Sequence, residues 1–187
     1  PRDSYVYIPE VGYQDKITHA HAFGGHKATI ETVENLLDIP VDYYVRLNFH
    51  AFVEVIDALG GIEMDVPYEF KESDSMDQRD SLHLKPGLQT VNGEEALALA
   101  RTRKLDNDIE RGKRQMEIIE AVADKAFSLD SVLNYDDILV AVGDNMTTNM
   151  TFDDMKTFIS YGSNITSNNI TTHTLEGTDY QPGSIYY

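Results

Sequence analysis

The stretch F-V-E-V-I-D-A-L-G-G-I-E-M-D-V, residues 52–66, joins a helical pattern to a strand pattern. The pair Gly60-Gly61 is typical of a helix end, and residues 62–66 after it predict a strand. A helix before the glycines is indicated by four apolar residues at helical spacing: Phe52, Val53, Ile56 and Leu59. A helix that leads directly into a strand in this way is typical of a layered α/β protein.

The alternation of strand and helix continues toward the N-terminus. Ser4–Ile8 is short, aromatic and β-branched, which predicts a strand. After Gly24-Gly25, residues 27–38 carry apolar side chains at helical spacing, and Pro40 marks the end of this helix. Val41–Phe49 is again β-branched and aromatic, so a second strand is expected there.

Toward the C-terminus the rhythm breaks and then resumes. Residues 67–85 are charged and short of apolar side chains, so a surface insertion is expected. Two Asn-x-x-Glu pairs then predict capped helix starts. The predicted elements are a helix opened by Asn92 and Glu95, a longer helix opened by Asn107 and Glu110 and running to about Phe127, a helix over Phe152–Tyr161 and a threonine-rich strand over Ile170–Leu175.

These elements predict an α/β protein with a single layered domain over residues 1–187, in which helices flank both faces of a central mixed β-sheet. With 187 residues and 41% apolar content, the chain can bury one substantial core. It contains no run of about 18 apolar residues and no signal-peptide pattern, so the chain itself is expected to be soluble. The opening P-R-D at residues 1–3 leads straight into a strand pattern, so the domain is expected to lack its N-terminal portion.

Charge and cysteine content exclude several functions. Fifteen basic and thirty-two acidic residues give a net charge of −17, which opposes binding to nucleic acid or to an anionic membrane surface. The absence of cysteine excludes disulfides and thiolate metal sites.

Basic residues nevertheless gather in one short segment. Six of the fifteen lie within residues 101–114: Arg101, Arg103, Lys104, Arg111, Lys113 and Arg114. Guanidinium groups keep their charge and bind phosphate oxygens through paired donors, so clustered arginines suit a diphosphate.

The helix expected from residue 108 would support this cluster. Asp108, Arg111 and Gln115 would share one face, which Ile118 and Val122 continue into the core. The helix N-terminus would also favour phosphate near residues 107–110. A carboxylate in this setting, that of Asp108, could orient the arginines, bind Mg²⁺ or accept a proton.

The alternative is a solvated helix face without a ligand. On that interpretation the charges form i, i+4 ion pairs, such as Glu110 with Arg114 and Lys113 with Glu117. Spacing alone does not separate the two interpretations.

The arginine-rich segment lies within a longer pattern. Residues 96–115 read A-L-A-L-A-R-T-R-K-L-D-N-D-I-E-R-G-K-R-Q, which resembles the ALxxxRxR…DxxRxxRQ signature of the LytR-CpsA-Psr family. Further segments resemble the family in the same order along the chain: P-R-D at 1–3, K-I-T-H-A-H-A-F-G-G at 16–25, I-P-V-D-Y-Y-V at 39–45 and I-D-A-L-G-G-I at 56–62.

The resemblance implies the fold and the activity of that family. Members are phosphotransferases that move a polyprenyl-diphosphate-linked glycopolymer, such as a teichoic acid or a capsule, onto a wall glycan such as peptidoglycan. Polyprenyl phosphate is released, Mg²⁺ is the cofactor, and the enzyme faces outward from the cell membrane, anchored by an N-terminal segment. Two variants stay open at the same site: a polyprenyl-diphosphate pyrophosphatase, and a non-catalytic polyprenyl-phosphate-binding scaffold for wall assembly.

Site residues follow from the resemblance position by position. It assigns a catalytic role to Arg101, Arg103, Asp108 and Arg111, where Asp108 organises the arginines or assists proton transfer. The implied diphosphate-binding residues are Arg2, Lys16, Arg101, Arg103, Arg111 and Gln115, with Lys16 the weaker candidate. The family's main Mg²⁺-binding aspartates precede the P-R-D motif, so the metal ligands are expected upstream of Pro1.

Overall fold

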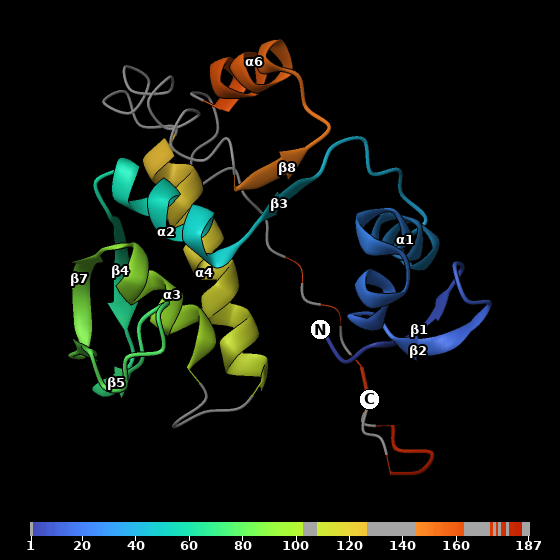
Figure 1. Ribbon diagram of the computed structural model, residues 1–187, viewed down its shortest axis with the longest axis horizontal. Coiled ribbons are helices and arrows are strands. Elements are labelled where there is room, and N and C mark those ends of the chain that lie inside the picture. Colours follow the sequence, from blue (N-terminus) through green and yellow to red (C-terminus); the bar gives the residue numbers. More distant parts are fainter. Residues whose placement is uncertain are drawn as a thin grey trace. The chain divides into compact units, whose positions relative to one another are not determined.

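The computed structural model describes residues 2–102, 108–126 and 145–162, together with residues 173, 175, 177–178 and 180–184 (Figure 1). The chain divides into two compact units. Unit 1 comprises Pro1–Tyr43 with Thr172–Tyr187, and unit 2 comprises Tyr44–Thr171. The single domain expected over residues 1–187 stays a prediction.

Unit 1 begins with a β-hairpin. Strand β1, Tyr5–Ile8, pairs antiparallel with β2, Tyr13–Lys16, so that Tyr5 lies opposite Lys16. The strand predicted over residues 4–8 is confirmed. Its partner β2 was not predicted, because the sequence Y-Q-D-K has no apolar alternation and is exposed or half-buried.

A long helix follows the hairpin. Helix α1, His19–Leu37, is interrupted at Gly24 and Gly25, where Gly25 has a positive φ of 67°. That backbone conformation favours glycine, because a side chain there would be strained. The helix predicted from residue 27 is confirmed, and it is preceded by a further helical segment that begins at His19, before the glycines.

Unit 2 opens with a short strand and a helix. Strand β3, Val45–Leu47, pairs antiparallel with β8, Met146–Thr148, and α2, Phe49–Ala58, follows β3. Asn48 caps α2 by accepting a 2.8 Å hydrogen bond from the backbone N–H of Ala51. The predicted helix end at Gly60-Gly61 is confirmed, and both glycines have a positive φ.

The core of unit 2 forms where two strands meet α3. Strand β4, Ile62–Val66, pairs antiparallel with β7, Gly87–Val91. Every second residue of β4 is buried, starting with Ile62, as expected for a strand with one face in the core. Helix α3, Gly93–Arg101, begins with the predicted capping box of Asn92 and Glu95.

The segment expected to be a surface insertion is mostly exposed, but it also forms two short strands that reach the core. It forms β5, Phe70–Glu72, and β6, Leu82–Leu84, which pair antiparallel. Phe70 and Leu84 are buried in the same core cluster as β4. These strands were not predicted because each is only three residues long, too short for a periodic apolar pattern to be recognised.

Two more helices complete the described part of the chain. Helix α4 spans Asp108–Ala126 and α6 spans Phe152–Gly162, close to the predicted bounds. Asn107 and most of the strand expected over Ile170–Leu175 lie outside the described residues. Within the described ranges, none of the helices is both long enough and apolar enough to cross a bilayer.

The mixed α/β class is confirmed, but the strands are organised differently from the expected central sheet. In the part of the chain that the structure describes, they form four separate two-stranded antiparallel sheets. A parallel neighbour would require a crossover connection, whereas β1–β2 and β5–β6 are hairpins that pair directly.

Candidate active site

The site is built around α3, whose first turn is fixed against α2. A side chain at Gly93 would bring its Cβ into a clash with the backbone of Val53, so only glycine allows this close approach. The Gly93 N–H donates a 2.8 Å hydrogen bond to Oδ1 of Asp57 on α2. Asp57 therefore stabilises the start of α3, across thirty-six residues of sequence.

The last turn of α3 is fixed against α4 by side chains that bind its free carbonyl groups. Arg114 donates from Nε to the carbonyl of Leu99 at 3.1 Å and from Nη2 to the carbonyl of Thr102 at 3.0 Å. Gln115 donates from Nε2 to the carbonyl of Ala100 at 3.0 Å. Carbonyls at a helix C-terminus lack intrahelical partners, and leaving them buried without a hydrogen bond would destabilise the folded protein. The side chains of Arg114 and Gln115 supply these hydrogen bonds.

The two arginines of α4 are both buried, with only 5% of each exposed. Arg111 lies on the predicted face that continues through Ile118 and Val122, which pack in the core. Arg114 was not predicted as a site residue, and its bonds to α3 make it a structural residue of this junction.

Arg101 is the last residue of α3 and extends its side chain to the surface. The guanidinium carbon lies 5.3 Å from the ring centroid of Phe49 on α2. Nη2 lies 3.8 Å from Oδ1 of Asp77, a long ion pair with a carboxylate that is 86% exposed. The Arg101 side chain is itself 37% exposed, so it is accessible to a ligand.

Of the predicted diphosphate-binding residues, which we call the clamp, three lie on the helices α3 and α4, which pack against each other: Arg101, Arg111 and Gln115. The Gln115 amide binds the residue directly before Arg101, and Arg111 lies one helical turn earlier on α4. Asp108 is the first residue of α4, as predicted for a helix N-terminus. Arg103 and the side chain of Asp108 lie outside the described residues.

The alternative of a solvated helix face with i, i+4 pairs is met only in part. Lys113, Glu110 and Glu117 are exposed, but the ion pair of Lys113 is with Glu110 at 2.8 Å, at i, i+3. This hydrogen bond raises the pKa of Lys113. Arg114, the expected partner of Glu110, is buried and bound to backbone carbonyls.

The remaining predicted phosphate ligands, Arg2 and Lys16, meet at one carboxylate in unit 1. Nζ of Lys16 lies 2.8 Å from Oδ1 of Asp3, and Nε of Arg2 lies 3.6 Å from Oδ2 of the same residue. The pairing of Tyr5 with Lys16 in the hairpin brings Lys16 back to the start of the chain. Asp3 was not predicted as a site residue, although its place in the P-R-D motif could have indicated it.

A second carboxylate lies at the end of the same hairpin. Oδ2 of Asp15 lies 2.9 Å from Nδ1 of His19, and Oδ1 accepts a 2.8 Å hydrogen bond from the Lys16 N–H. Burial would raise the pKa of Asp15, but the bonds to His19 and Lys16 outweigh it, so the pKa is lowered below 3.8. His19 therefore has a local carboxylate partner.

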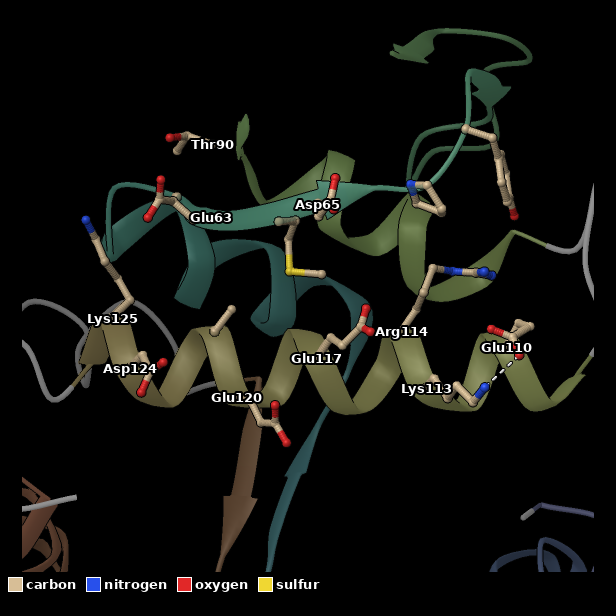
Figure 2. Close-up of a pocket in the computed structure, with 15 residues that line it drawn as sticks. Glu63, Asp65, Thr90, Glu110, Lys113, Arg114, Glu117, Glu120, Asp124 and Lys125 are labelled. Carbon is tan, nitrogen blue, oxygen red and sulfur yellow. Dashed lines mark hydrogen bonds and ion pairs between the residues drawn. The ribbon is translucent and has the colours of Figure 1, made fainter. Parts of the chain in front are cut away.

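A groove of about 990 Å³ lies between α4 and β4 (Figure 2). Its charged lining comprises six carboxylates and three basic groups: Glu63, Asp65, Glu110, Glu117, Glu120 and Asp124 against Lys113, Arg114 and Lys125. An excess of carboxylates repels phosphate, so this groove does not suit a diphosphate. Arg111 and Arg101 do not line it.

The described residues do not by themselves form a metal site. Across residues 2–102, 108–126 and 145–162, no three histidine, aspartate or glutamate side chains gather in a way that could hold a metal ion. Asp3, the carboxylate closest to predicted phosphate ligands, is bound to two cationic side chains. The described residues therefore do not supply a complete set of protein ligands for a metal ion.

Comparison with known proteins assigns this chain to a family. The family profile described as the LytR_cpsA_psr family matches residues 1–187. A polyisoprenyl-teichoic acid–peptidoglycan teichoic acid transferase, TagT of Bacillus subtilis, is 44% identical over all of this chain and 58% of its own length. An uncharacterised Staphylococcus aureus protein is 46% identical over all of this chain and 46% of its own length. The chain thus spans about half the length of the curated relatives it matches.

Solved structures agree. The crystal structure of B. subtilis TagV matches all of this chain and 73% of its own, with a TM-score of 0.88 and 37% identity. A structure described as TagT bound to LIIa-WTA matches all of this chain and 69% of its own, with a TM-score of 0.79 and 40% identity. Because profile, sequence and structure agree over the whole chain, this protein belongs to the LytR-CpsA-Psr family.

Proposed function

We propose that this protein is a phosphotransferase that moves a polyprenyl-diphosphate-linked glycopolymer, such as a teichoic acid, onto a wall glycan such as peptidoglycan. The observation that carries the proposal is the accessible Arg101 at the end of α3, which is followed on α4 by the buried Arg111 of the same signature. The names of the transferases that match the whole chain support the same substrate class.

The arginines provide the charge that the reaction requires. Arg101, Arg103 and Arg111 bind the diphosphate oxygens and stabilise the negative charge that grows as the bond to the leaving group breaks. Gln115 contributes through the backbone that it holds, since its amide nitrogen binds the carbonyl of Ala100. Arg2 and Lys16 are secondary contributors, because a phosphate must compete with Asp3 for both.

The transfer itself is a displacement at phosphorus. The oxygen of an acceptor sugar hydroxyl forms a bond to the glycan-side phosphorus, while the bond from that phosphorus to the bridging oxygen breaks. The bridging oxygen and its electron pair leave with polyprenyl phosphate. The hydroxyl proton passes to a base, a role for which we propose Asp108 at the first turn of α4.

Two properties of the whole protein belong to the proposal. The enzyme acts at the outer face of the cell membrane, where its lipid-linked donor and glycan acceptor would meet, and an N-terminal segment anchors it there. Mg²⁺ supports the transfer, with its main ligands upstream of Pro1. When bound, the ion would neutralise diphosphate charge.

A product assay tests the proposal. The protein with its membrane-proximal sequence is incubated with Mg²⁺ and a polyprenyl-diphosphate glycan, with and without peptidoglycan strands. The proposed transferase attaches the glycan to peptidoglycan and releases polyprenyl phosphate, and chelation with EDTA stops both.

Other outcomes would identify the alternatives. Release of polyprenyl phosphate at the same rate without an acceptor would indicate a pyrophosphatase. Lipid binding that depends on Arg101 without any turnover would indicate a non-catalytic scaffold.

A further inference from the structure

Arg101 has a fixed backbone but a long side chain that must still be held. Both ends of α3 are anchored, by Asp57 at the first turn and by Arg114 and Gln115 at the last. The guanidinium group nevertheless lies at the end of a flexible chain, and holding it in one place costs rotamer entropy. A contact that restricts the side chain before the ligand arrives would lower this cost at binding.

Phe49 provides such a contact. Its ring lies 5.3 Å from the guanidinium carbon of Arg101, within the range of a cation–π interaction. Phe49 is 59% exposed, so core packing does not account for a large apolar side chain at this position.

The backbone beneath the ring is well anchored. Asn48 caps α2 through the Ala51 N–H, and its Nδ2 donates a 2.8 Å hydrogen bond to Oδ1 of Asn145. The Asn48 N–H also binds the carbonyl of Asn145, at 3.4 Å. Phe49 therefore projects from a fixed point at the first turn of α2, not from a loop.

An aromatic ring holds a guanidinium without consuming its binding capacity. A carboxylate in close contact with a guanidinium occupies its N–H donors and neutralises its charge. Asp77, whose Oδ1 lies 3.8 Å from Nη2 of Arg101, makes only a long contact of this kind. A ring face leaves the in-plane N–H donors free for phosphate oxygens and leaves the charge intact.

We infer that Phe49 is a positioning residue for the diphosphate, acting by stacking under Arg101 and presenting its guanidinium to the phosphate oxygens. This inference rests on the proposed function of Arg101. Phe49 itself does not contact the reacting atoms in this scheme.

The first test measures the stack directly and needs no substrate. An aromatic ring shifts the NMR signals of protons above its face, so the Arg101 side-chain protons resonate upfield in the wild-type protein. Phe49→Leu abolishes the shift and Phe49→Tyr retains it. Phe158→Leu removes another exposed aromatic residue, on α6, and serves as the matched control. An Arg101 spectrum unchanged in Phe49→Leu would overturn the inference.

The second test links the stack to binding. Farnesyl diphosphate is titrated calorimetrically into the wild-type protein and the same variants, with farnesol as the uncharged probe. Phe49→Leu weakens farnesyl diphosphate binding about two- to fivefold, matching the usual strength of an exposed cation–π contact. Phe49→Tyr restores the affinity, Phe158→Leu leaves it unchanged, and farnesol binding is the same in every protein.

The outcomes separate this inference from the proposed function. If Arg101→Ala weakens farnesyl diphosphate binding but Phe49→Leu does not, the positioning role is wrong and the clamp stands. If farnesyl diphosphate binds equally well to the wild type and to Arg101→Ala, the proposed role of Arg101 fails, whatever the NMR signals show. Equal losses for Phe49→Leu and Phe49→Tyr would also overturn the stacking role, since tyrosine keeps the ring.

Discussion

Helices α3 and α4 and the first sixteen residues of the chain both present basic residues that the family resemblance implies, but they hold them differently. On the two helices, Arg114 binds backbone carbonyls and Arg101 lies over an aromatic ring. In the first sixteen residues, Arg2 and Lys16 share the carboxylate of Asp3.

The difference separates structural cations from ligand-binding ones. Backbone carbonyls at a buried helix end cannot be exchanged for a ligand, so Arg114 supports the scaffold. Among the described residues, the ion pair of Arg101 is a long one to an exposed carboxylate, so Arg101 can accept a phosphate at little cost. Arg2 and Lys16 fall between the two, because a phosphate would first have to displace Asp3.

The largest expected effect compares Arg101 with Arg2. Arg101→Ala lowers kcat/KM for glycopolymer transfer on the order of 10²- to 10³-fold, as for loss of other groups that stabilise transition-state charge. Arg2→Ala has a much smaller effect, because Arg2 already shares its charge with Asp3. Steady-state kinetics on both variants checks this, and an equal or larger loss for Arg2→Ala would reverse the comparison.

The next effect tests Arg114 as a structural residue. Arg114→Met leaves the carbonyls of Leu99 and Thr102 without these donors, so the free energy of unfolding falls by about 3 kcal/mol. Urea denaturation measures the change. Lys113→Met, at an exposed neighbour on the same helix, is the control and leaves stability unchanged. A stable Arg114→Met protein with impaired ligand binding would make Arg114 a ligand residue instead.

A smaller effect tests the anchoring of α3. Asn92→Ala removes the side chain that accepts from the Glu95 N–H in the capping box, and costs about 1 kcal/mol of stability. Thermal unfolding measures it, and Asn92→Ser should recover most of the loss because serine is also a good N-cap. No change in the midpoint for Asn92→Ala would mean that the Asp57 bond alone fixes this end.

The smallest effect concerns a carboxylate of the β1–β2 hairpin, Asp15, and the dependence of stability on pH. Folding lowers the pKa of Asp15 below its ordinary value of 3.8. The contribution of Asp15 to stability is therefore fully present above pH 3.8 and is lost as the pH falls through the lowered pKa. His19→Ala removes one of the bonds responsible and reduces this acid dependence. Thermal unfolding between about pH 2 and pH 5 compares the two proteins. Identical pH profiles would show that His19 does not contribute.

Elements with their own periodic pattern could be predicted from the sequence. Helix α2, the capped start of α3 and strand β4 were predicted correctly, because burial of one face imposes a period that a single segment reveals. The strands β2, β5 and β6 were missed, since each is short and its partner, not its own pattern, makes it a strand.

The candidate site, too, could be predicted from the sequence only in part. Clustering of arginines in an acidic chain indicated a phosphate site near residues 101–115 without any coordinates. The family resemblance assigned Arg111, and not Arg114, to the site, but the sequence could not show that both side chains are buried or that Arg114 binds the backbone of α3. Phe49 lies fifty-two residues before Arg101, and no local pattern connects the two.

The sequence by itself thus determined the secondary-structure alternation, the concentration of positive charge and the family signature, since all three depend on residue identity and spacing along the chain. Only the tertiary structure decided which arginine is structural and which is accessible, that Asp3 binds two cations, and that the groove beside β4 is acidic. The physical reason is that a charged group's role is set by its burial and its partners, and these come from segments distant in sequence.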